Sequence, residues 1–530
     1  MRFRKNRMML TRRRSWLTMR NAVLGASLCL LRLLSGCAEQ PVPAVETESP
    51  QQQQATAVQE KEVWQVIYVN DQRIGYARSQ TQREGQGESQ IVQQQSDSYL
   101  KLKRFGQDLN LETHLQTKET PGGELLSYMF EMQNPPAGAT VSEGEIRDGT
   151  LQIKTKVANQ VKQSQLKWES TFHSPSYIEQ FFQQHPMQPG EEQSFSMLLP
   201  EYNKVTRVDL KAREYKQTEL YGGAQAECLH VEMNQSLLPG MTIDLYVTRE
   251  GKIPKTVADF LGSAMITYTV SKEVALEALS GKELDLAVQT LIKVKPIPGA
   301  HQTEKVVYEI TLADGDPTSV LPESETQEVK KLDVHRARLT VRKAAAPQAF
   351  PEAKVDAEYL QPTQFLQSDD PRVIEHAKQA VQSETNPWKQ AVLMEKYVRE
   401  HLRKKNFSTA LASAAEVAKN MEGDCTEHAV LLAAMLRAMK LPSRVAVGLV
   451  YIQSRASFGG HMWTEVYLDG RWIPLDATLG QGGIGAGHIK LADSSLSENA
   501  PAPLAIFLPI LQAVGKLSIE VVETTPGTTR

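Results

Sequence analysis

Residues 61–285 are dominated by short runs in which apolar and polar side chains alternate, and this pattern limits the possible fold more than any other feature. Alternation with a period of two is typical of β-strands that bury one face. Turn signals separate the runs, for example Asn70-Asp71, Asp148-Gly149 and Glu250-Gly251. The sequence therefore predicts an antiparallel, twisted sheet at 61–285, curved or barrel-like. A second β segment at 286–350 is either a small sandwich or an extension of that sheet.

The length of the chain indicates several domains, because 530 residues exceed what one ordinary core contains. The composition, with 41% hydrophobic and 23% charged residues, is typical of a globular protein. The net charge of −3 is unevenly distributed, since residues 1–37 contribute +9 and the remainder therefore carries −12. An acidic chain without clustered lysine and arginine is poorly suited to bind nucleic acid, so we expect no nucleic-acid partner.

The first 37 residues have the pattern of an export signal. A basic stretch at 12–14 precedes an apolar stretch at 22–31 that is too short to span a bilayer comfortably. The segment ends in Leu34-Ser35-Gly36-Cys37, which resembles the bacterial lipobox. That resemblance implies lipidation of Cys37 and an exported, membrane-anchored protein on the periplasmic or cell-envelope side. An ordinary signal peptide with an incidental cysteine and a twin-arginine signal are the alternatives. Residues 38–60, rich in Gln, Pro and Glu, predict a disordered tether.

The chain has four cysteines, Cys29, Cys37, Cys228 and Cys425. Cleavage of the signal would remove Cys29 and lipidation would use Cys37, so no disulfide framework is available. Cys228 lies in a strand-like run and is expected to be a small buried apolar residue, with His230 on the sheet surface. Cys425 would then be one of only two cysteines left in the exported protein. Its retention indicates a chemical role for its thiol.

The composition shifts near residue 351, and helical periodicity predicts helices at 372–383 and 388–404. Asp424 is a good helix N-cap, and Glu427 three residues later completes a capping box. Cys425 therefore occupies the first helical position, where free backbone N–H groups and the helix dipole favour a thiolate. The dipole contributes about 0.3–1 kcal/mol at exposed sites, less than one pKa unit. A thiol with the ordinary pKa of about 8.5 therefore needs an imidazolium partner as well.

A predicted hairpin farther along the chain supplies such a partner. Asp469-Gly470 is a strong two-residue turn signal between strand-like segments at 458–468 and 471–476. Counting back from the turn places Asp476 diagonal to His461 on one face, where such neighbours lie about 7–8 Å apart. A carboxylate and an imidazole can bridge that distance, so Asp476 can orient His461. A bulge in the hairpin would reverse the faces and remove this relation.

These segments together resemble the transglutaminase-like superfamily. The motifs that carry the resemblance are Gly423-Asp424-Cys425-Thr426-Glu427-His428, Ala446-Val447-Gly448, His461-Met462-Trp463-Thr464-Glu465-Val466 and Trp472-Ile473-Pro474-Leu475-Asp476-Ala477-Thr478. The resemblance implies a papain-like α+β domain, expected at 351–500. It also implies a triad in which Cys425 is the nucleophile, His461 the general base and acid, and Asp476 the orienting carboxylate. The chain is thus expected to be multidomain, with a β-rich N-terminal region before this domain and a helix and strand at 501–530.

Three further residues are candidates for the substrate cleft or for support of the site. Trp463 is expected to form a wall of the cleft rather than to donate to an oxyanion, and Gly460 precedes His461 in the same strand. His428 follows Cys425 by three residues and is either a packed side chain or a support for the site. A zinc site of Cys425, His428 and His461 lacks a clearly placed further ligand, so no metal is expected.

A glycine-rich stretch, Gly480-Gln481-Gly482-Gly483-Ile484-Gly485, fits the letters of a dinucleotide fingerprint. A strand-like run follows it instead of a helix, so the dinucleotide interpretation fails in its context. We expect no cofactor, and a mobile loop beside the site.

The expected function is acyl transfer through a thioester on Cys425, with a protein or peptide of the cell envelope as substrate. Hydrolysis is favoured over cross-linking because the sequence indicates neither a lysine-binding site nor calcium ligands. The alternative is a non-catalytic envelope scaffold or peptide-binding lipoprotein that retains the triad. In either case the membrane contact would be the lipid anchor at Cys37.

Overall fold

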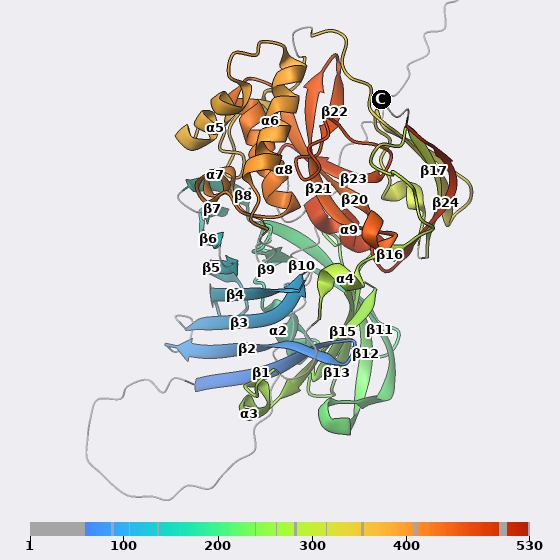
Figure 1. The fold of residues 1–530 in the computed structure, drawn as a ribbon. Coiled ribbons are helices and arrows are strands. Elements are labelled where there is room, and N and C mark those ends of the chain that lie inside the picture. The colour runs from blue at the N-terminus through green and yellow to red at the C-terminus, as the bar shows by residue number, and fades with distance from the viewer. Residues whose placement is uncertain are drawn as a thin grey trace, which may run out of the picture.

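The computed structural model describes residues 59–527, with gaps at 86–89, 105, 135–136, 158–159, 239, 261, 280–283, 314, 351–353, 406–410 and 498–505. It consists of a large sheet and, above it in Figure 1, a C-terminal unit of helices and two smaller sheets. The predicted export signal, its lipidation site Cys37 and the tether up to residue 58 lie outside the described residues. Within the described ranges, no helix combines the length and apolar character needed to cross a bilayer.

The large sheet contains 15 strands in two antiparallel meanders that meet where β1 pairs with β15. Its strands are β1 (Gln59–Val69), β2 (Gln72–Glu84), β3 (Ile91–Arg104), β4 (Gln107–Glu119), β5 (Leu125–Asn134), β6 (Ala137–Arg147), β7 (Thr150–Val157), β8 (Gln160–Lys167), β9 (Phe172–His173), β10 (Glu192–Leu199), β11 (Lys204–Glu219), β12 (Gln225–Gln235), β13 (Thr242–Val247), β14 (Lys255–Phe260) and β15 (Ser263–Val270). The short β9 is a parallel partner of β10. Asn70 and Asp71 adopt φ angles of 49° and 61°, as the predicted two-residue turn between β1 and β2 requires.

The apolar positions of the alternating runs face a common core. Leu100 and Leu102 of β3, for example, are 2% and 1% exposed. Helix α2 (Tyr177–Gln184) enters this core through Phe181 and Phe182. Cys228 is fully buried in β12, as predicted. The prediction of an antiparallel β-rich domain is therefore confirmed.

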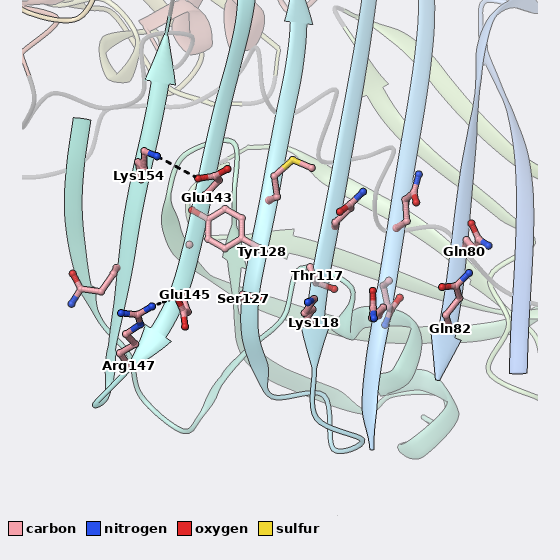
Figure 2. A pocket seen from close by; sticks show the side chains of 17 residues that line it. Gln80, Gln82, Thr117, Lys118, Ser127, Tyr128, Glu143, Glu145, Arg147 and Lys154 are labelled. Carbon is pink, nitrogen blue, oxygen red and sulfur yellow. Dashed lines mark hydrogen bonds and ion pairs between the residues drawn. The ribbon is translucent and has the colours of Figure 1, made fainter. Parts of the chain in front are cut away.

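The outward face of β2–β7 forms a hollow of about 590 Å³. Two rows of directly paired residues cross these strands. One row is Gln82, Gln93, Lys118, Ser127, Glu145 and Gln152, and the other is Gln80, Gln95, Gln116, Met129, Glu143 and Lys154. Figure 2 shows these side chains projecting from neighbouring strands, with Glu143 paired to Lys154 and Glu145 paired to Arg147. The hollow is thus lined by amides and charges and suits a polar ligand.

The segment at 286–350 is neither a separate sandwich nor an extension of the large sheet. Its first strand, β16 (Ile292–Lys293), pairs with a strand of the C-terminal unit. The next three are β17 (Lys305–Leu312), β18 (Gln327–Lys331) and β19 (Arg336–Arg342). They form a four-stranded sheet that the C-terminal strand β24 (Leu517–Thr525) completes by pairing with β17. The correction has a physical reason: β17 is an inner strand whose backbone needs partners on both edges, and the second partner, β24, comes from far along the chain.

The remainder of the C-terminal unit places helices against an antiparallel sheet. Its helices are α5 (Pro371–Val381), α6 (Pro387–His401), α7 (Ala414–Asn420) and α8 (Cys425–Ala438), and its main strands are β20 (Ser443–Ile452), β21 (Ser457–Leu468), β22 (Arg471–Leu475) and β23 (His488–Ser494). The first two helices confirm the predicted ones to within three residues. Helix α8 is buried on nearly all sides, because α5, α6 and α7 pack on it and β21 lies beneath it.

Short helical segments connect these larger elements. They are α3 (Lys272–Ala275), α4 (Leu286–Gln289) and α9 (Leu508–Ala513), with single 3-10 turns at Tyr221–Gly223, Pro317–Ser319, Ala357–Tyr359 and Gln453–Arg455. Helix α9 contacts β20 and β23, so the C-terminal segment packs back on this unit.

The large sheet and the C-terminal unit are in direct contact. Val157 of β7 belongs to the same apolar cluster as the core of the C-terminal unit. Gln364 donates from Nε2 to the carbonyl oxygen of Thr155 at 3.4 Å. The β domain can therefore contribute side chains to a site in the C-terminal unit.

Candidate active site

The first turn of α8 is built by a capping box. Asp424 Oδ1 accepts from the backbone N–H of Thr426, and Glu427 Oε2 accepts from the backbone N–H of Asp424, each at 2.9 Å. Asp424 and Glu427 are both 1% exposed. Burial, and after it the neighbouring carboxylate of Asp424, raises the pKa of Glu427 to about 8. Cys425 thus occupies the predicted first helical position with a partly exposed side chain, beside the two buried acids of the capping box.

Strands β21 and β22 form the predicted hairpin. Leu468 pairs with Arg471 and Thr464 with Leu475, without a bulge between them. Asp469 and Gly470 in the turn have φ angles of 56° and 73°. This register carries Asp476, the residue after β22, to the side of His461.

Asp476 holds the imidazole of His461 through its Oδ2 atom. His461 Nε2 lies 2.9 Å from Asp476 Oδ2, and Asp476 is 1% exposed. The other oxygen, Oδ1, accepts from the backbone N–H and the hydroxyl of Thr478 at 2.8 and 2.5 Å. Burial alone would raise the pKa of Asp476, but the facing His461 and the donors around it hold the pKa well below its usual value. Asp476 therefore remains a carboxylate.

His461 connects this carboxylate to Cys425. Nε2 is occupied by Asp476, which leaves Nδ1 as the nitrogen available to the thiol, and His461 and Cys425 share a hydrogen bond. Burial lowers the pKa of His461, but Asp476 and a Cys425 thiolate outweigh burial and raise that pKa to about 10. The arrangement can hold a thiolate–imidazolium pair, which is the form needed for nucleophilic attack.

Two buried residues that the sequence did not indicate complete the surroundings of Asp476. His488, the first residue of β23, places Nε2 at 3.0 Å from Asp476 Oδ2. Glu395 of α6 accepts from the backbone N–H of Asp476 at 2.9 Å and from that of Gly482 at 2.6 Å. Burial raises the pKa of Glu395 to about 7. Glu395 thus anchors both the orienting carboxylate and the glycine-rich loop that follows it.

The three support candidates lie near the site in different ways. Trp463 is 2% exposed and stacks with His461 at 6.3 Å between ring centroids, so it supports the histidine from the interior and is not an exposed cleft wall. Its Nε1 has no hydrogen-bond partner among the described residues. His428 is buried, and its Nδ1 donates to the carbonyl oxygen of Asp424 at 2.5 Å, which ties it to the helix cap. Gly460 is exposed, and a Cβ there would lie 3.3 Å from Ile510 of α9.

Three side chains of the site also have the spacing of metal ligands. One ligand atom from each of His461, Asp476 and His488 lies within 4.8 Å of the other two. The expectation of no metal concerned a different set, Cys425, His428 and His461, for which no further ligand was clearly placed. The hydrogen bonds of 2.9 and 3.0 Å from the two Nε2 atoms to one oxygen nevertheless account for the cluster as a histidine-orienting device.

Comparisons with known proteins concern mainly the C-terminal unit. Residues 374–477 match the model of the transglutaminase-like superfamily. No curated protein matches the chain. A solved structure of a putative cysteine protease from Cytophaga hutchinsonii has a TM-score of 0.28 and 17% identity, over 43% of this chain and 90% of that one. A β-barrel-like protein from Brucella abortus has a TM-score of 0.30 and 11% identity, over 40% and 96%. A putative protease from Parabacteroides distasonis has a TM-score of 0.18 and 11% identity, over 66% and 64%.

Proposed function

Because residues 374–477 form a transglutaminase-like superfamily domain, we propose that this chain is a thiol enzyme that transfers acyl groups through a thioester on Cys425. The observation that supports this most is the connected series from the capped Cys425 through His461 to the buried Asp476. The same series supports a papain-like arrangement of nucleophile, base and orienting acid.

The first half of the reaction forms the thioester. The Cys425 thiolate attacks the carbonyl carbon of an amide or peptide bond, and the C–N bond breaks as the tetrahedral intermediate collapses. The proton held at His461 Nδ1 passes to the leaving nitrogen, which departs as a neutral amine. The backbone N–H of Cys425, at the free end of α8, is suited to stabilise the oxyanion. Asp476 keeps the second nitrogen of His461 protonated throughout.

The second half returns the enzyme to its starting state. Water gives one proton to His461 Nδ1 as its oxygen attacks the thioester carbonyl, and the C–S bond then breaks. The acid product leaves, and the thiolate–imidazolium pair is restored. The protonated state of His461 at the start, favoured by its pKa of about 10, is therefore regenerated.

We favour water over an amine as the second substrate because of the charges around the thiol. Lys405 interacts with Cys425, whereas the nearby Arg104 is already paired with Asp424. A lysine ε-ammonium approaching the thioester would be repelled by Lys405, whereas neutral water would not. The proposed reaction is thus peptide or amide hydrolysis. The substrate proposed is a peptide of the cell envelope, reached by an exported protein that Cys37 anchors to a membrane.

The hollow on β2–β7 favours a second candidate function, in which the chain is an envelope scaffold that binds polar ligands. All of its lining residues come from the β domain and none from α8 or β21. The two functions differ in whether Cys425 converts a bound peptide to product.

Incubating the full chain with a peptide library, with and without a labelled primary amine, tests the proposed function. We expect peptide cleavage at the same rate in both arms, no incorporation of the amine, and no cleavage by Cys425→Ala. Mass spectrometry of the peptides measures both outcomes. Amine incorporation that depends on Cys425 would replace hydrolysis by cross-linking, and equal peptide binding by both proteins without turnover would favour the scaffold.

A further inference from the structure

Arg104, at the end of β3 in the large sheet, reaches the first turn of α8. Its Nη1 atom lies 2.6 Å from Asp424 Oδ2. The Asp424 side chain is 1% exposed and that of Arg104 is 22% exposed, so the ion pair is largely shielded from water. Arg104 also shares a hydrogen bond with Cys425. A cation from the β domain therefore contacts the residue before the nucleophile and the nucleophile itself.

The end of β3 is anchored, so this contact does not depend on one long side chain alone. The backbone N–H of Lys103 donates to the carbonyl oxygen of Leu284 at 2.7 Å, and the N–H of Gly106 donates to Asp285 Oδ2 at 2.8 Å. On the far side of the turn, Gln107 Nε2 donates to the carbonyl oxygen of Lys405 at 3.2 Å. The first two bonds fix the end of β3 to the segment at 284–285, and the third ties the start of β4 to the segment that follows α6.

Asp424 creates an electrostatic difficulty that Arg104 can remove. The side chain of Asp424 caps the N-terminus of α8. A buried carboxylate one residue from Cys425, however, disfavours a thiolate by repulsion. Glu427, the other acid of the capping box, is protonated below its pKa of about 8 and adds little charge. Burial lowers the pKa of Arg104, but the negative charges on Asp424 and Cys425 outweigh burial and raise it above its usual value.

The other titratable groups around the thiol come from separate elements. His428 on α8 is neutral, because burial lowers its pKa to about 4. His461 on β21 supplies the imidazolium, and Asp476 after β22 is already paired with it. Lys405, in the segment after α6, interacts with Cys425 as a second cation. Only Arg104 forms an ion pair with Asp424 among the described residues.

We propose that Arg104 is a positioning residue of the active site, contributed by the β domain, which neutralises Asp424 and holds Cys425 as a thiolate beside His461. The inference rests on the proposed function and extends it: the active site is shared between two domains. The transglutaminase-like domain alone would then carry the triad but lack the cation that balances its helix cap.

The test compares the pH profile of Cys425 alkylation by iodoacetamide in four full-length proteins, read by mass spectrometry of the Cys425 peptide. In Arg104→Met, we expect the midpoint to move up by about one pH unit, which makes the reaction roughly tenfold slower at pH values below the midpoint of the parent protein. Asp424→Asn keeps a capping side chain and is expected to move the midpoint down. The double variant Arg104→Met/Asp424→Asn is expected to return toward the parent. Arg213→Met, which breaks an exposed ion pair with Glu232 in the same β domain, is the matched control and should not move it.

Three results would overturn the inference without touching the proposed function. An unchanged midpoint in Arg104→Met would show that the cation does not act on the thiol. An equal upward shift of the midpoint in Arg104→Met and in the double variant would show that Arg104 is a structural contact only. Faster alkylation in Arg104→Met would mark it as an inhibitory latch. Arg104→Lys keeps the positive charge, so its alkylation midpoint is expected to lie closer to that of the parent than the midpoint of Arg104→Met does. If the parent protein itself reacts as an ordinary thiol, the proposed function fails instead.

Discussion

Replacing His461 with alanine is expected to lower acyl transfer by on the order of 10⁶-fold, close to the effect of replacing Cys425 itself. The two residues act as a unit: without the imidazole, the thiol loses both the partner that stabilises its ionised form and the acid that protonates the leaving nitrogen. The measurement is the rate of amide or activated-ester cleavage for the parent, His461→Ala, Cys425→Ala and the double variant. Non-additivity is part of the prediction, since the double variant should be no slower than either single variant.

An exposed histidine serves as the control for this experiment. His335 lies in the turn before β19, and His335→Ala should leave the rate unchanged. A His461→Ala protein that keeps more than about a tenth of the parent activity would contradict the assigned role, because general acid–base catalysis alone contributes roughly 10²–10⁴-fold.

Asp476→Asn is expected to reduce turnover by about 10⁴-fold while leaving the fold intact. Asp476 Oδ2 accepts hydrogen bonds from both His461 and His488, and an amide of the same shape can accept at only one of its two positions. His461 would then adopt the wrong tautomer, and the imidazolium would lose the carboxylate that raises its pKa to about 10. Steady-state kinetics should show a fall in kcat with a smaller change in KM.

Asp469→Asn is the matched control for this substitution. Asp469 lies in the turn of the same hairpin with a φ of 56°, which asparagine also tolerates. Equal effects of the two variants would indicate that Asp476 acts through the stability of the hairpin and not through His461.

The parts of the site that the sequence predicted depend on short-range rules. The capping box needs only Asp424 and Glu427, and the hairpin register needs only the two-residue turn before Arg471. Each rule acts within a few residues, so each could be applied without knowledge of the fold. Together these rules predicted Cys425 at the start of a helix and Asp476 beside His461, as the structure has them.

The residues that sequence analysis missed reach the site through long-range packing. His488 approaches Asp476 because β23 pairs with β20, and Glu395 does so because α6 lies across the end of β22. Arg104 arrives from another domain. None of the three lies in a local pattern that marks a site. The same limit explains the small sheet, whose edge strand β24 comes from the end of the chain and pairs with β17.

The rate of Cys425 alkylation as a function of pH, in the parent and in His461→Ala, tests the central claim most directly. The claim predicts a parent rate that is nearly constant from about pH 6 to about pH 9, because the thiolate–imidazolium pair persists while His461 keeps its proton. In His461→Ala the rate should instead rise tenfold per pH unit up to about 8.5, the ordinary value for a thiol. Buried Cys228 provides an unreactive reference within the same protein. Coincident profiles for the two proteins, both rising to about pH 8.5, would contradict the claim that Cys425 and His461 form the reactive pair.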